Sequence, residues 1–311
     1  MKAMLLAEPP QTPLLLERDI PQPQLRPGEV LVRVFAAGVT PTELIWYPTL
    51  HQKNGDPRTG AVPCHEFSGE IAGIGDGVAG ISIGQEIYGM NDWFAEGALA
   101  EYCVTQPDWI APKPQRLRHP EAASVPIGAL TAWQGLFDRA KLQPGEHVLV
   151  HGGAGAVGIF AIQLARSRGA HVATTVSAHN FEFVQSLGAN QVIDYKAVRF
   201  ENEVRDIDVV FDAVGGDTLR RSWDVLKQGG RMVTIAADSE NTADERERRA
   251  FFIVEPNRQQ LTEISRRLDA GKLQAVIDAT LPFPQALDAY TGAAQKKGRG
   301  KQVVTIVESA R

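Results

Sequence analysis

Residues 146–158, with the sequence Glu-His-Val-Leu-Val-His-Gly-Gly-Ala-Gly-Ala-Val-Gly, decide the fold of this chain. Their first part is mostly apolar and follows the turn signal Pro144-Gly145, which predicts a short β-strand. Gly153, Gly155 and Gly158 then match the pattern G-x-G-x-x-G. Such glycines allow a tight turn out of the strand, close approach of the backbone to a pyrophosphate, and close packing of the following helix.

The residues that follow complete a structural unit. Residues 159–168 place apolar side chains on one helical face, Gly169 ends that helix, and His171–Val176 predicts a second strand. A strand, a glycine turn, a helix and a second strand form the βαβ unit that binds dinucleotides, with the phosphates at the helix N-terminus. The alternative is a glycine-rich turn that binds nothing.

The residues after the second strand indicate which dinucleotide is bound. An acidic side chain there would accept hydrogen bonds from a ribose 2′-hydroxyl and favour NAD, but no Asp or Glu lies between His171 and Phe181. Ser177 and Asn180 can donate hydrogen bonds to a 2′-phosphate, so we predict NADPH, although no Arg or Lys lies in this segment. Tyr195 ends the next predicted strand and either supplies a further donor or is an ordinary half-buried tyrosine.

Length and composition limit the class of protein. The chain has 311 residues, of which 43% are hydrophobic and 22% charged, as expected for about two globular domains. Its net charge of −5 gives no bulk attraction to nucleic acid or to an anionic membrane. Two cysteines, Cys64 and Cys103, are too few for a disulfide framework or a Cys-rich metal cluster. The N-terminus has no signal-peptide pattern, so we expect a cytoplasmic protein.

The pattern along the chain indicates an α/β protein with two domains. Residues 1–118 contain short apolar strands between Gly and Pro turns, which predicts a compact barrel-like domain. Residues 119–266 alternate strands and helices, which predicts a doubly wound parallel sheet. Within it, 251–254 is predicted as a strand, and the charged segment 238–250 as a solvated loop or helix face, with a lid as the minority interpretation. Residues 267–311 resemble the first domain and are expected to complete it.

The chain resembles the medium-chain dehydrogenase/reductase superfamily over nearly its whole length. The matching stretches are Lys141–Glu146 leading into His151–Gly158, Leu187–Ala189 with Val192–Tyr195, Phe211–Gly216, Pro63–Gly69 and Gly300–Val304. Within the superfamily it is most similar to the quinone oxidoreductase (zeta-crystallin-like) branch. That resemblance implies a GroES-like catalytic domain, a Rossmann cofactor domain, NADPH and a homodimer.

The resemblance also bears on zinc. His65 stands where the zinc alcohol dehydrogenases of the superfamily carry a ligand histidine, but Thr40 stands where they carry the first ligand cysteine. The region of the third ligand, 124–129, has no Cys, Asp or Glu. A catalytic zinc site needs three protein ligands, so we expect no metal, and His65 as a hydrogen-bonded pocket or core residue. Reduction of a quinone or an activated C=C bond needs no Lewis acid, because hydrogen-bond donors can hold the developing oxyanion.

The resemblance places those donors after Gly38, where relatives often carry Asn-Pro-x-Asp and this chain has Thr40-Pro41-Thr42-Glu43. Thr40, Glu43 and Tyr47 are the candidate catalytic residues; Tyr47 is either a donor to an enolate or an aromatic wall beside Trp46, and Glu43 either acts or orients its neighbours.

The expected cofactor contacts include Thr131, which lies in a segment that approaches the nicotinamide in relatives. The full set is Thr131, Gly153, Ala154, Gly155, Ala156, Val157, Gly158, Ser177, Asn180, Tyr195, Val214, Ile235 and Ala236. A basic cluster near the C-terminus, Lys296, Lys297, Arg299 and Lys301, is interpreted as solvated surface, with a contribution of Arg299 to a 2′-phosphate left open.

Together these features predict a zinc-independent, NADPH-dependent oxidoreductase that transfers hydride to a quinone or an activated C=C bond of an enone or enal. Two alternatives stay open. One is a reductase of carbonyls or enoyl thioesters. The other is a non-catalytic NADPH-binding sensor protein, because a fold with a cofactor site does not guarantee catalysis.

Overall fold

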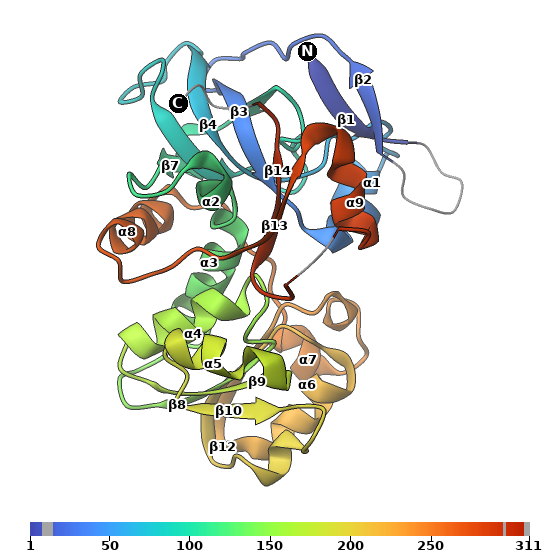
Figure 1. Cartoon of the computed structure of the whole chain (residues 1–311). Coiled ribbons are helices and arrows are strands. Elements are labelled where there is room, and N and C mark those ends of the chain that lie inside the picture. The colour runs from blue at the N-terminus through green and yellow to red at the C-terminus, as the bar shows by residue number, and fades with distance from the viewer. Residues whose placement is uncertain (8–14, 295–296, 308–311) are drawn as a thin grey trace.

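The structure is a computed structural model that describes residues 1–7, 15–294 and 297–307. The chain folds into two lobes, and one of them is built from two parts of the chain that are separated in the sequence (Figure 1). One lobe holds both the early strands and the last strands of the chain, coloured blue, cyan and red. The other holds the middle of the chain, coloured green to orange. The C-terminal strands therefore return to the first lobe, as expected from the sequence.

The first lobe is built on a seven-stranded sheet in the order β13-β14-β3-β4-β5-β7, with β6 also paired to β3. A two-stranded sheet, β1 with β2, lies beside it. The strands are β1 (Lys2–Leu6), β2 (Leu15–Asp19), β3 (Val30–Gly38), β4 (Glu66–Ile74), β5 (Glu86–Met90), β6 (Tyr102–Thr105), β7 (Ile110–Pro112), β13 (Ile277–Pro282) and β14 (Lys301–Thr305). The pairing of β14 with β3 joins the two ends of the chain.

The second lobe is a five-stranded parallel sheet in the order β10-β9-β8-β11-β12. Its strands are β8 (His147–His151), β9 (His171–Val176), β10 (Gln191–Asp194), β11 (Ile207–Asp212) and β12 (Leu226–Thr234). All six residues of β11 are buried, as expected for a central strand covered on both faces. Because β8 starts the lobe and has β9 and β11 on opposite sides, the chain reverses direction across the sheet there, and ligands bind at such a point.

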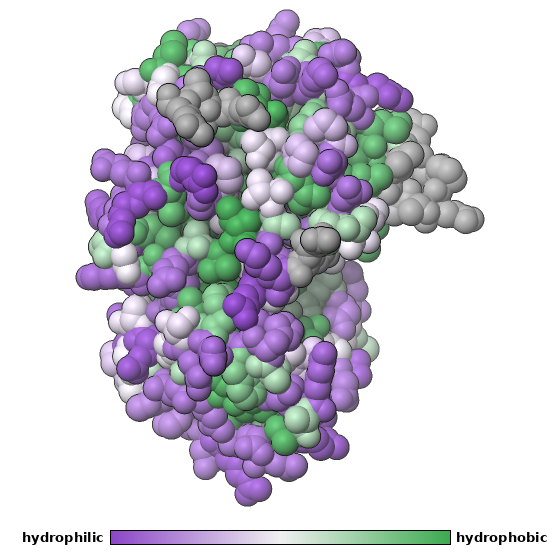
Figure 2. All heavy atoms as spheres, viewed as in Figure 1, coloured by the Kyte–Doolittle hydropathy of each residue, from purple (hydrophilic) through white to green (hydrophobic). Residues whose placement is uncertain are grey.

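Helices surround this sheet and join the lobes. Those of the second lobe are α4 (Gly158–Ser167), α5 (Phe181–Ser186), α6 (Gly216–Ser222) and α7 (Glu245–Ala250). Those between or against the lobes are α1 (Tyr47–Leu50), α2 (His119–Ala123), α3 (Pro126–Trp133), α8 (Arg258–Asp269) and α9 (Ala286–Thr291). A π-helical stretch, Gln134–Arg139, continues α3. On the face shown in Figure 2 hydrophilic residues predominate, and hydrophobic ones form small groups, one of them where the lobes meet.

The predicted α/β architecture, with a GroES-like lobe and a Rossmann parallel sheet, is confirmed. The domain boundaries remain a prediction, and the one at residue 266 falls inside α8. That helix contacts the first lobe, since the Tyr88 hydroxyl donates to the Leu261 carbonyl oxygen at 2.7 Å. None of the described helices is both long and apolar enough to cross a membrane.

The predicted strand at 251–254 is wrong. Only an isolated bridge joins Thr234 to Phe251, and the segment then leaves β12. The Val254 carbonyl oxygen accepts from the Trp93 indole at 3.1 Å instead of from a neighbouring strand. The apolar side chains that suggested a strand line a cavity between the lobes. In the charged segment before it, the Asp244 side chain caps the N-terminus of α7.

Candidate functional site

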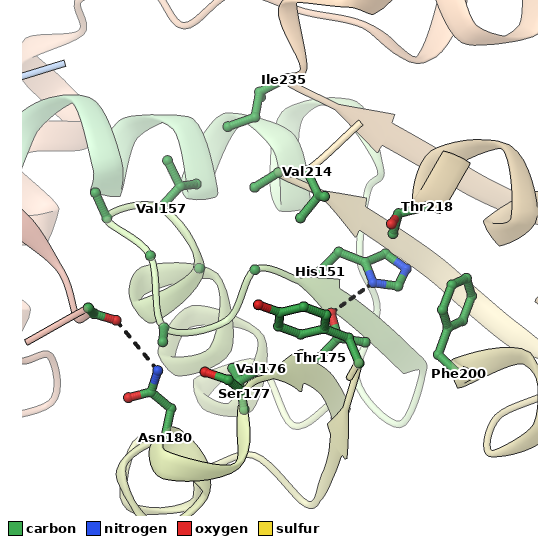
Figure 3. A pocket seen from close by; sticks show the side chains of 18 of the residues that line it. His151, Val157, Thr175, Val176, Ser177, Asn180, Phe200, Val214, Thr218 and Ile235 are labelled. Carbon is green, nitrogen blue, oxygen red and sulfur yellow. Dashed lines mark hydrogen bonds between the residues drawn. The ribbon is translucent and has the colours of Figure 1, made fainter. Parts of the chain in front are cut away.

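A first cavity of about 600 Å³ opens at the carboxyl ends of the parallel strands (Figure 3). The strand ends His151, Thr175 and Val176 form its inner wall together with the glycine loop. The predicted cofactor residues that line it are Ala154, Gly155, Ala156, Val157, Gly158, Ser177, Asn180, Tyr195, Val214 and Ile235. Residues at the ends of all five strands and from one loop therefore converge where a dinucleotide binds in such sheets.

The glycines of the loop have different roles from each other. The left-handed turn is made by Gly152 (φ +77°), one residue before the motif, rather than by Gly153. A Cβ at Gly153 would lie 2.0 Å from the Thr174 hydroxyl, so this glycine packs against β9 and is not part of the cavity wall. A Cβ at Gly158 would lie 2.2 Å from the Gly152 carbonyl oxygen, so this glycine keeps α4 close to the turn.

Gly155 is the glycine whose missing side chain faces the cavity. A Cβ there would meet only the Gly152 carbonyl oxygen, at 3.3 Å, and would otherwise point into open space. The absence of this Cβ leaves the backbone accessible beside the first turn of α4, as close approach of a pyrophosphate requires. A 600 Å³ cavity with such a backbone surface fits a dinucleotide.

His151 forms the inner wall of the cavity and is buried. The Ser222 hydroxyl donates to the Thr218 carbonyl oxygen, so the His151 Nε2–H donates to Ser222 Oγ at 2.9 Å. His151 Nδ1 is then left to accept from the Thr175 hydroxyl at 3.0 Å. Burial and, secondarily, the charge of Arg221 lower the pKa of His151 from 6.5 to about 3, which keeps the imidazole neutral.

The edge of the cavity near the end of β9 carries an arginine from the far end of the sequence. Arg299 Nε donates to the Asn180 side-chain oxygen at 2.7 Å, and Arg299 Nη2 donates to the His179 carbonyl oxygen at 2.8 Å. Its guanidinium also lies 4.7 Å from the centre of the Phe183 ring. Arg299 is half-buried and docked on this segment, so the alternative left open for it, a positive charge beside Asn180, has a structural basis. The predicted donor Tyr195 lies on the cavity rim and is 58% exposed.

Asp212 holds the opposite edge of the cavity. Its carboxylate accepts from the backbone of Val214 and Gly215 and, at 2.7 Å, from the Thr234 hydroxyl. Burial raises the pKa of Asp212 above its usual value, and these three donors oppose that shift. The loop that carries Val214 is thereby fixed to β12. Sequence reasoning did not identify this role of Asp212, although an acid ending a buried strand is a usable signal.

A second cavity of about 240 Å³ lies between the lobes and shares Ala156, Val157 and Ile235 with the first. Its walls are mostly apolar, with Trp46, Trp93 and the 251–254 segment. The polar side chains in it are Thr40, Thr42, Thr131, Asp278, Lys301 and Gln302. A small apolar chamber with few polar groups, joined to a dinucleotide cavity, is suited to holding a small apolar substrate.

The three candidate catalytic residues lie in three different environments. Thr40 lines the second cavity, and its hydroxyl accepts from Lys301 Nζ at 3.1 Å. Tyr47 is 55% exposed, stacks on His51 and is not among the described residues that line this cavity. Glu43 is fully buried behind the cavity wall and is not in the lining either.

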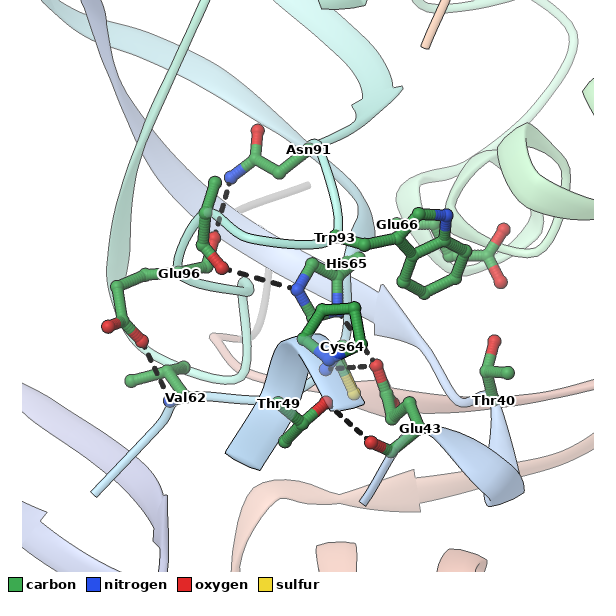
Figure 4. A network of polar contacts seen from close by, with 12 residues as sticks. Thr40, Glu43, Thr49, Val62, Cys64, His65, Glu66, Asn91, Trp93 and Glu96 are labelled. Atoms are coloured by element: carbon green, nitrogen blue, oxygen red, sulfur yellow. Dashed lines mark hydrogen bonds and ion pairs between the residues drawn. The ribbon is translucent and has the colours of Figure 1, made fainter. Parts of the chain in front are cut away.

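Glu43 organises a buried polar network (Figure 4). Its carboxylate accepts from the Tyr290 hydroxyl at 2.6 Å and from the Cys64 backbone at 3.1 Å, and it lies 3.0 Å from His65 Nδ1. Cys64 has a left-handed backbone (φ 65°), which is costly for a residue with a side chain and which this network stabilises. Glu43 therefore anchors the segment that carries Thr40 and Trp46, in line with the hypothesis that it orients its neighbours.

The remaining predicted cofactor residues are placed as follows. Thr131 lines the second cavity, with its hydroxyl donating to the Ile127 carbonyl oxygen at 2.6 Å. Gly153 and Ala236 do not line either cavity. Gly153 packs on Thr174 instead. Ala236 directly follows Ile235, which is the residue after β12 that lines both cavities.

The residues at the position of the superfamily's zinc do not fit a metal ion. His65 Nδ1 faces Glu43, and Nε2 lies 3.3 Å from the Ala95 carbonyl oxygen, so both ring nitrogens have protein partners. Thr40 contacts Lys301 instead of offering a thiolate. Within residues 1–7, 15–294 and 297–307, no group of three or more His, Cys, Asp or Glu side chains could hold a metal. A catalytic zinc site needs three such ligands.

The sequence-based interpretation of Lys301 as a surface residue is wrong. It was expected on the solvated surface with its basic neighbours, of which Lys296 lies outside the described residues. Instead it is 5% exposed, lines the second cavity and forms an ion pair with the buried Glu66. No local pattern reveals this, because the pairing of β14 with β3 brings Lys301 beside Thr40.

Comparisons with known proteins agree with this geometry. Residues 26–115 match the family described as the alcohol dehydrogenase GroES-like domain, and residues 187–304 match the family described as zinc-binding dehydrogenase. The 2-methylene-furan-3-one reductase of Solanum lycopersicum is 31% identical, over 94% of this chain and 75% of the relative. The chloroplastic NADPH-dependent alkenal/one oxidoreductase of Arabidopsis thaliana is also 31% identical, with the same two coverages.

Solved structures show the same architecture. The quinone oxidoreductase from Coxiella burnetii superposes with a TM-score of 0.87 at 30% identity, covering 99% of both chains.

Proposed function

Because the chain belongs to the medium-chain dehydrogenase/reductase superfamily, in its quinone oxidoreductase branch, and is an oxidoreductase of that family, we propose that it transfers hydride from NADPH to a small quinone or to the activated C=C bond of an enone or enal. The observation that carries the proposal is the union of the two cavities at Ala156, Val157 and Ile235. A dinucleotide in the first cavity would extend toward a small apolar substrate in the second.

The choice of NADPH is supported by the charge at the end of β9. Ser177, Asn180 and the docked Arg299 present hydroxyl, amide and guanidinium groups there, and no carboxylate lies between His171 and Phe181. A 2′-phosphate gains charge-assisted hydrogen bonds from arginine, whereas a ribose 2′-hydroxyl gains little. The glycine loop and the first turn of α4 would hold the pyrophosphate, as Gly155 allows.

The choice of a quinone or enone is supported by the chemistry of the second cavity. Its walls are apolar and aromatic. At the superfamily's metal-ligand positions, Thr40 offers a hydroxyl that contacts Lys301, and His65 an imidazole whose two nitrogens face protein partners. NADPH supplies the hydride when bound. The chain's own groups are then required to orient the acceptor, exclude water and hold the oxyanion, which needs no zinc.

The test of the cofactor proposal is a calorimetric titration of the metal-stripped protein with NADPH and with NADH. We expect NADPH to bind on the order of 100-fold more tightly, since the 2′-phosphate contacts are worth about 2–3 kcal/mol. The variant Arg299→Met should bring the two affinities closer together. Arg139→Met should leave their ratio unchanged, because Arg139 lies beside β12, and β8 and β11 stand between β12 and β9. Tighter binding of NADH would contradict the proposal.

The test of the reaction is NADPH oxidation over a panel of enones, enals and quinones, with simple aldehydes and alcohols for comparison. Turnover confined to the conjugated acceptors, unchanged by added zinc, is the expected result. Reduction of aldehydes alone, or activity that appears only with zinc, would favour a carbonyl reductase or a zinc dehydrogenase. Tight NADPH binding without turnover of any acceptor would favour a sensor.

Two further features complete the proposal, the homodimer based on the resemblance to the family and the location on the sequence analysis. We infer that the protein is a homodimer and that it is located in the cytoplasm. Light scattering and sedimentation at several protein concentrations test the first, and microscopy of the tagged full chain tests the second.

A further inference from the structure

Lys301 lies where the two lobes and the two cavities meet. It is the first residue of β14, and the preceding Gly300 donates its backbone N–H to the Ala154 carbonyl oxygen of the glycine loop at 2.8 Å. The side chain extends into the second cavity and is almost completely buried. The same short segment thus touches the dinucleotide-binding loop through its backbone and the substrate chamber through a cation.

The ammonium group is held by two protein contacts. Lys301 Nζ forms an ion pair with Glu66 Oε1 and donates to Thr40 Oγ1 at 3.1 Å. Glu66 is fully buried, and its other oxygen accepts from the Ile127 backbone N–H at 2.8 Å. An ammonium group has three N–H donors, so one remains after these contacts. A buried ion pair adds little net stability, because desolvation offsets its attraction, so stability alone does not account for this pair in the cavity wall.

Lys301 supplies the positive charge of the second cavity. Among the described residues that line it, the charged side chains are Asp278 and Lys301. One oxygen of the Asp278 carboxylate, Oδ1, accepts from the backbone N–H groups of Lys297, at 2.7 Å, and Arg299, at 3.3 Å. A negative charge that develops on a bound substrate therefore meets one cation, in a chamber whose apolar walls strengthen the attraction.

We propose that Lys301 and Thr40 together hold the oxyanion that forms on the substrate, with Glu66 fixing the ammonium group; the inference rests on the proposed reduction of enones and quinones. The direction of the hydrogen bond from Lys301 to Thr40 supports a joint role for these two residues. Because Thr40 Oγ1 accepts from Lys301, its own hydrogen is free to donate to an oxygen in the cavity. Lys301 makes the Thr40 hydroxyl a stronger donor by polarising it.

The step balances without a covalent bond to the protein. For an enone, the hydride that NADPH would supply when bound would form a new C–H bond at the β-carbon. The electron pair of the C=C bond would then form a double bond between the α-carbon and the carbonyl carbon, and the π pair of the carbonyl group would move onto its oxygen, which leaves an enolate. Thr40 and Lys301 donate hydrogen bonds to that oxygen. The enolate then takes a proton from water, and the oxidised cofactor and the saturated ketone leave.

The decisive variant removes both buried charges at once. Glu66→Gln with Lys301→Met keeps an acceptor for the Ile127 N–H and avoids a lone buried carboxylate, which alone could unfold the protein. We expect kcat with a weakly activated enone to fall by about 10²- to 10³-fold, the usual loss when an oxyanion donor is removed. The loss should be smaller with a strongly electron-poor quinone. NADPH affinity and acceptor KM should change by less than about threefold. The exposed Lys272→Met is the matched control.

A second measurement does not depend on turnover. A nitrophenolate ion carries its charge on an oxygen and resembles the enolate, and its absorbance distinguishes phenolate from phenol. The wild-type protein with NADP⁺ should favour bound phenolate, and the double variant should favour bound phenol, while Lys272→Met should behave as wild type.

Two results would overturn the proposal. One is a folded, NADPH-binding double variant whose kcat and phenolate binding match the wild type. The other is an equal loss with every acceptor accompanied by loss of NADPH affinity, which would assign Lys301 a structural role. If the wild-type protein reduces no acceptor, the proposed function fails, and the phenolate titration still decides whether Lys301 and Thr40 bind an oxyanion.

Discussion

The two cavities meet at three residues, yet they are assembled in different ways. Most of the first cavity comes from one continuous stretch, 151–158, and from the ends of neighbouring parallel strands. The second is assembled from segments far apart in the sequence, including 39–46, 127–131, 251–254 and 300–302. The first cavity is shaped mainly by backbone conformation and the second mainly by side chains. Substitutions of glycines should therefore affect the first cavity, and substitutions of buried side chains the second.

The largest expected effect is at the anchor of the second cavity. Glu43→Leu leaves the Tyr290 hydroxyl, the Cys64 N–H and His65 Nδ1 without their buried partner. We expect the free energy of unfolding to fall on the order of 4 kcal/mol, because each unpaired buried group costs about 1–3 kcal/mol. Urea denaturation measures this. Tyr290→Phe, which removes one of these contacts, should cost about 1 kcal/mol. Equal losses in the two variants would show that Glu43 is not the centre of the network.

The next effect separates two glycines of the first cavity. In Gly158→Ala the new Cβ would lie 2.2 Å from the Gly152 carbonyl oxygen, so the turn must move, and both stability and NADPH affinity should fall, the latter by about 100-fold or more. Gly155→Ala points into the cavity, so it should weaken NADPH binding on the order of 10-fold at nearly unchanged Tm.

Calorimetry and thermal unfolding of both glycine variants test this difference. A Gly155→Ala protein that binds NADPH as tightly as the wild type would mean that the pyrophosphate does not approach this backbone. Acceptor KM should be less affected than NADPH affinity in both variants, because the glycine loop contributes only Ala156 and Val157 to the second cavity.

An effect that depends on pH, and is smaller near neutral pH, reports on the inner wall of the first cavity. In the folded protein His151 stays neutral down to a pH of about 3, whereas in the unfolded chain it gains a proton below pH 6.5. Between these pKa values the unfolded state binds more protons, so stability falls as the pH falls, by up to about 1.4 kcal/mol per pH unit. Above 6.5 this contribution does not change.

His151→Asn should flatten that slope, and His171→Asn on the exposed end of the next strand should not. The measurement is the urea midpoint at several pH values across this window. Equal slopes for wild type and His151→Asn would show that the imidazole is not held neutral by the fold.

The smallest expected effect concerns Tyr47. Because its ring stacks on His51 outside the cavity lining, Tyr47→Phe should change kcat and KM by less than about twofold. Trp46→Ala, one residue away in the cavity wall, should raise the acceptor KM about 10-fold or more by removing apolar contact. A large loss of kcat in Tyr47→Phe would restore the hypothesis that this phenol donates to the substrate.

Sequence patterns were sufficient to predict structure where residues close together in the sequence determine the local backbone. The strand, the glycine turn and α4 were predictable because backbone freedom and helical spacing are local properties. Most residues of the first cavity followed, because the ends of parallel strands meet at one edge of a sheet. The strand predicted at 251–254 failed, because apolar residues that line a cavity have the same composition as a buried strand.

By itself, the sequence determined the parallel-sheet lobe and the site of its dinucleotide cavity. Only the tertiary structure decided that Lys301 is buried beside Thr40, that Arg299 docks on Asn180, and that Tyr47 faces outward. The physical reason is distance along the chain. A glycine turn depends on its own φ angles, whereas the partner of a lysine 261 residues from Thr40 depends on which strands pair.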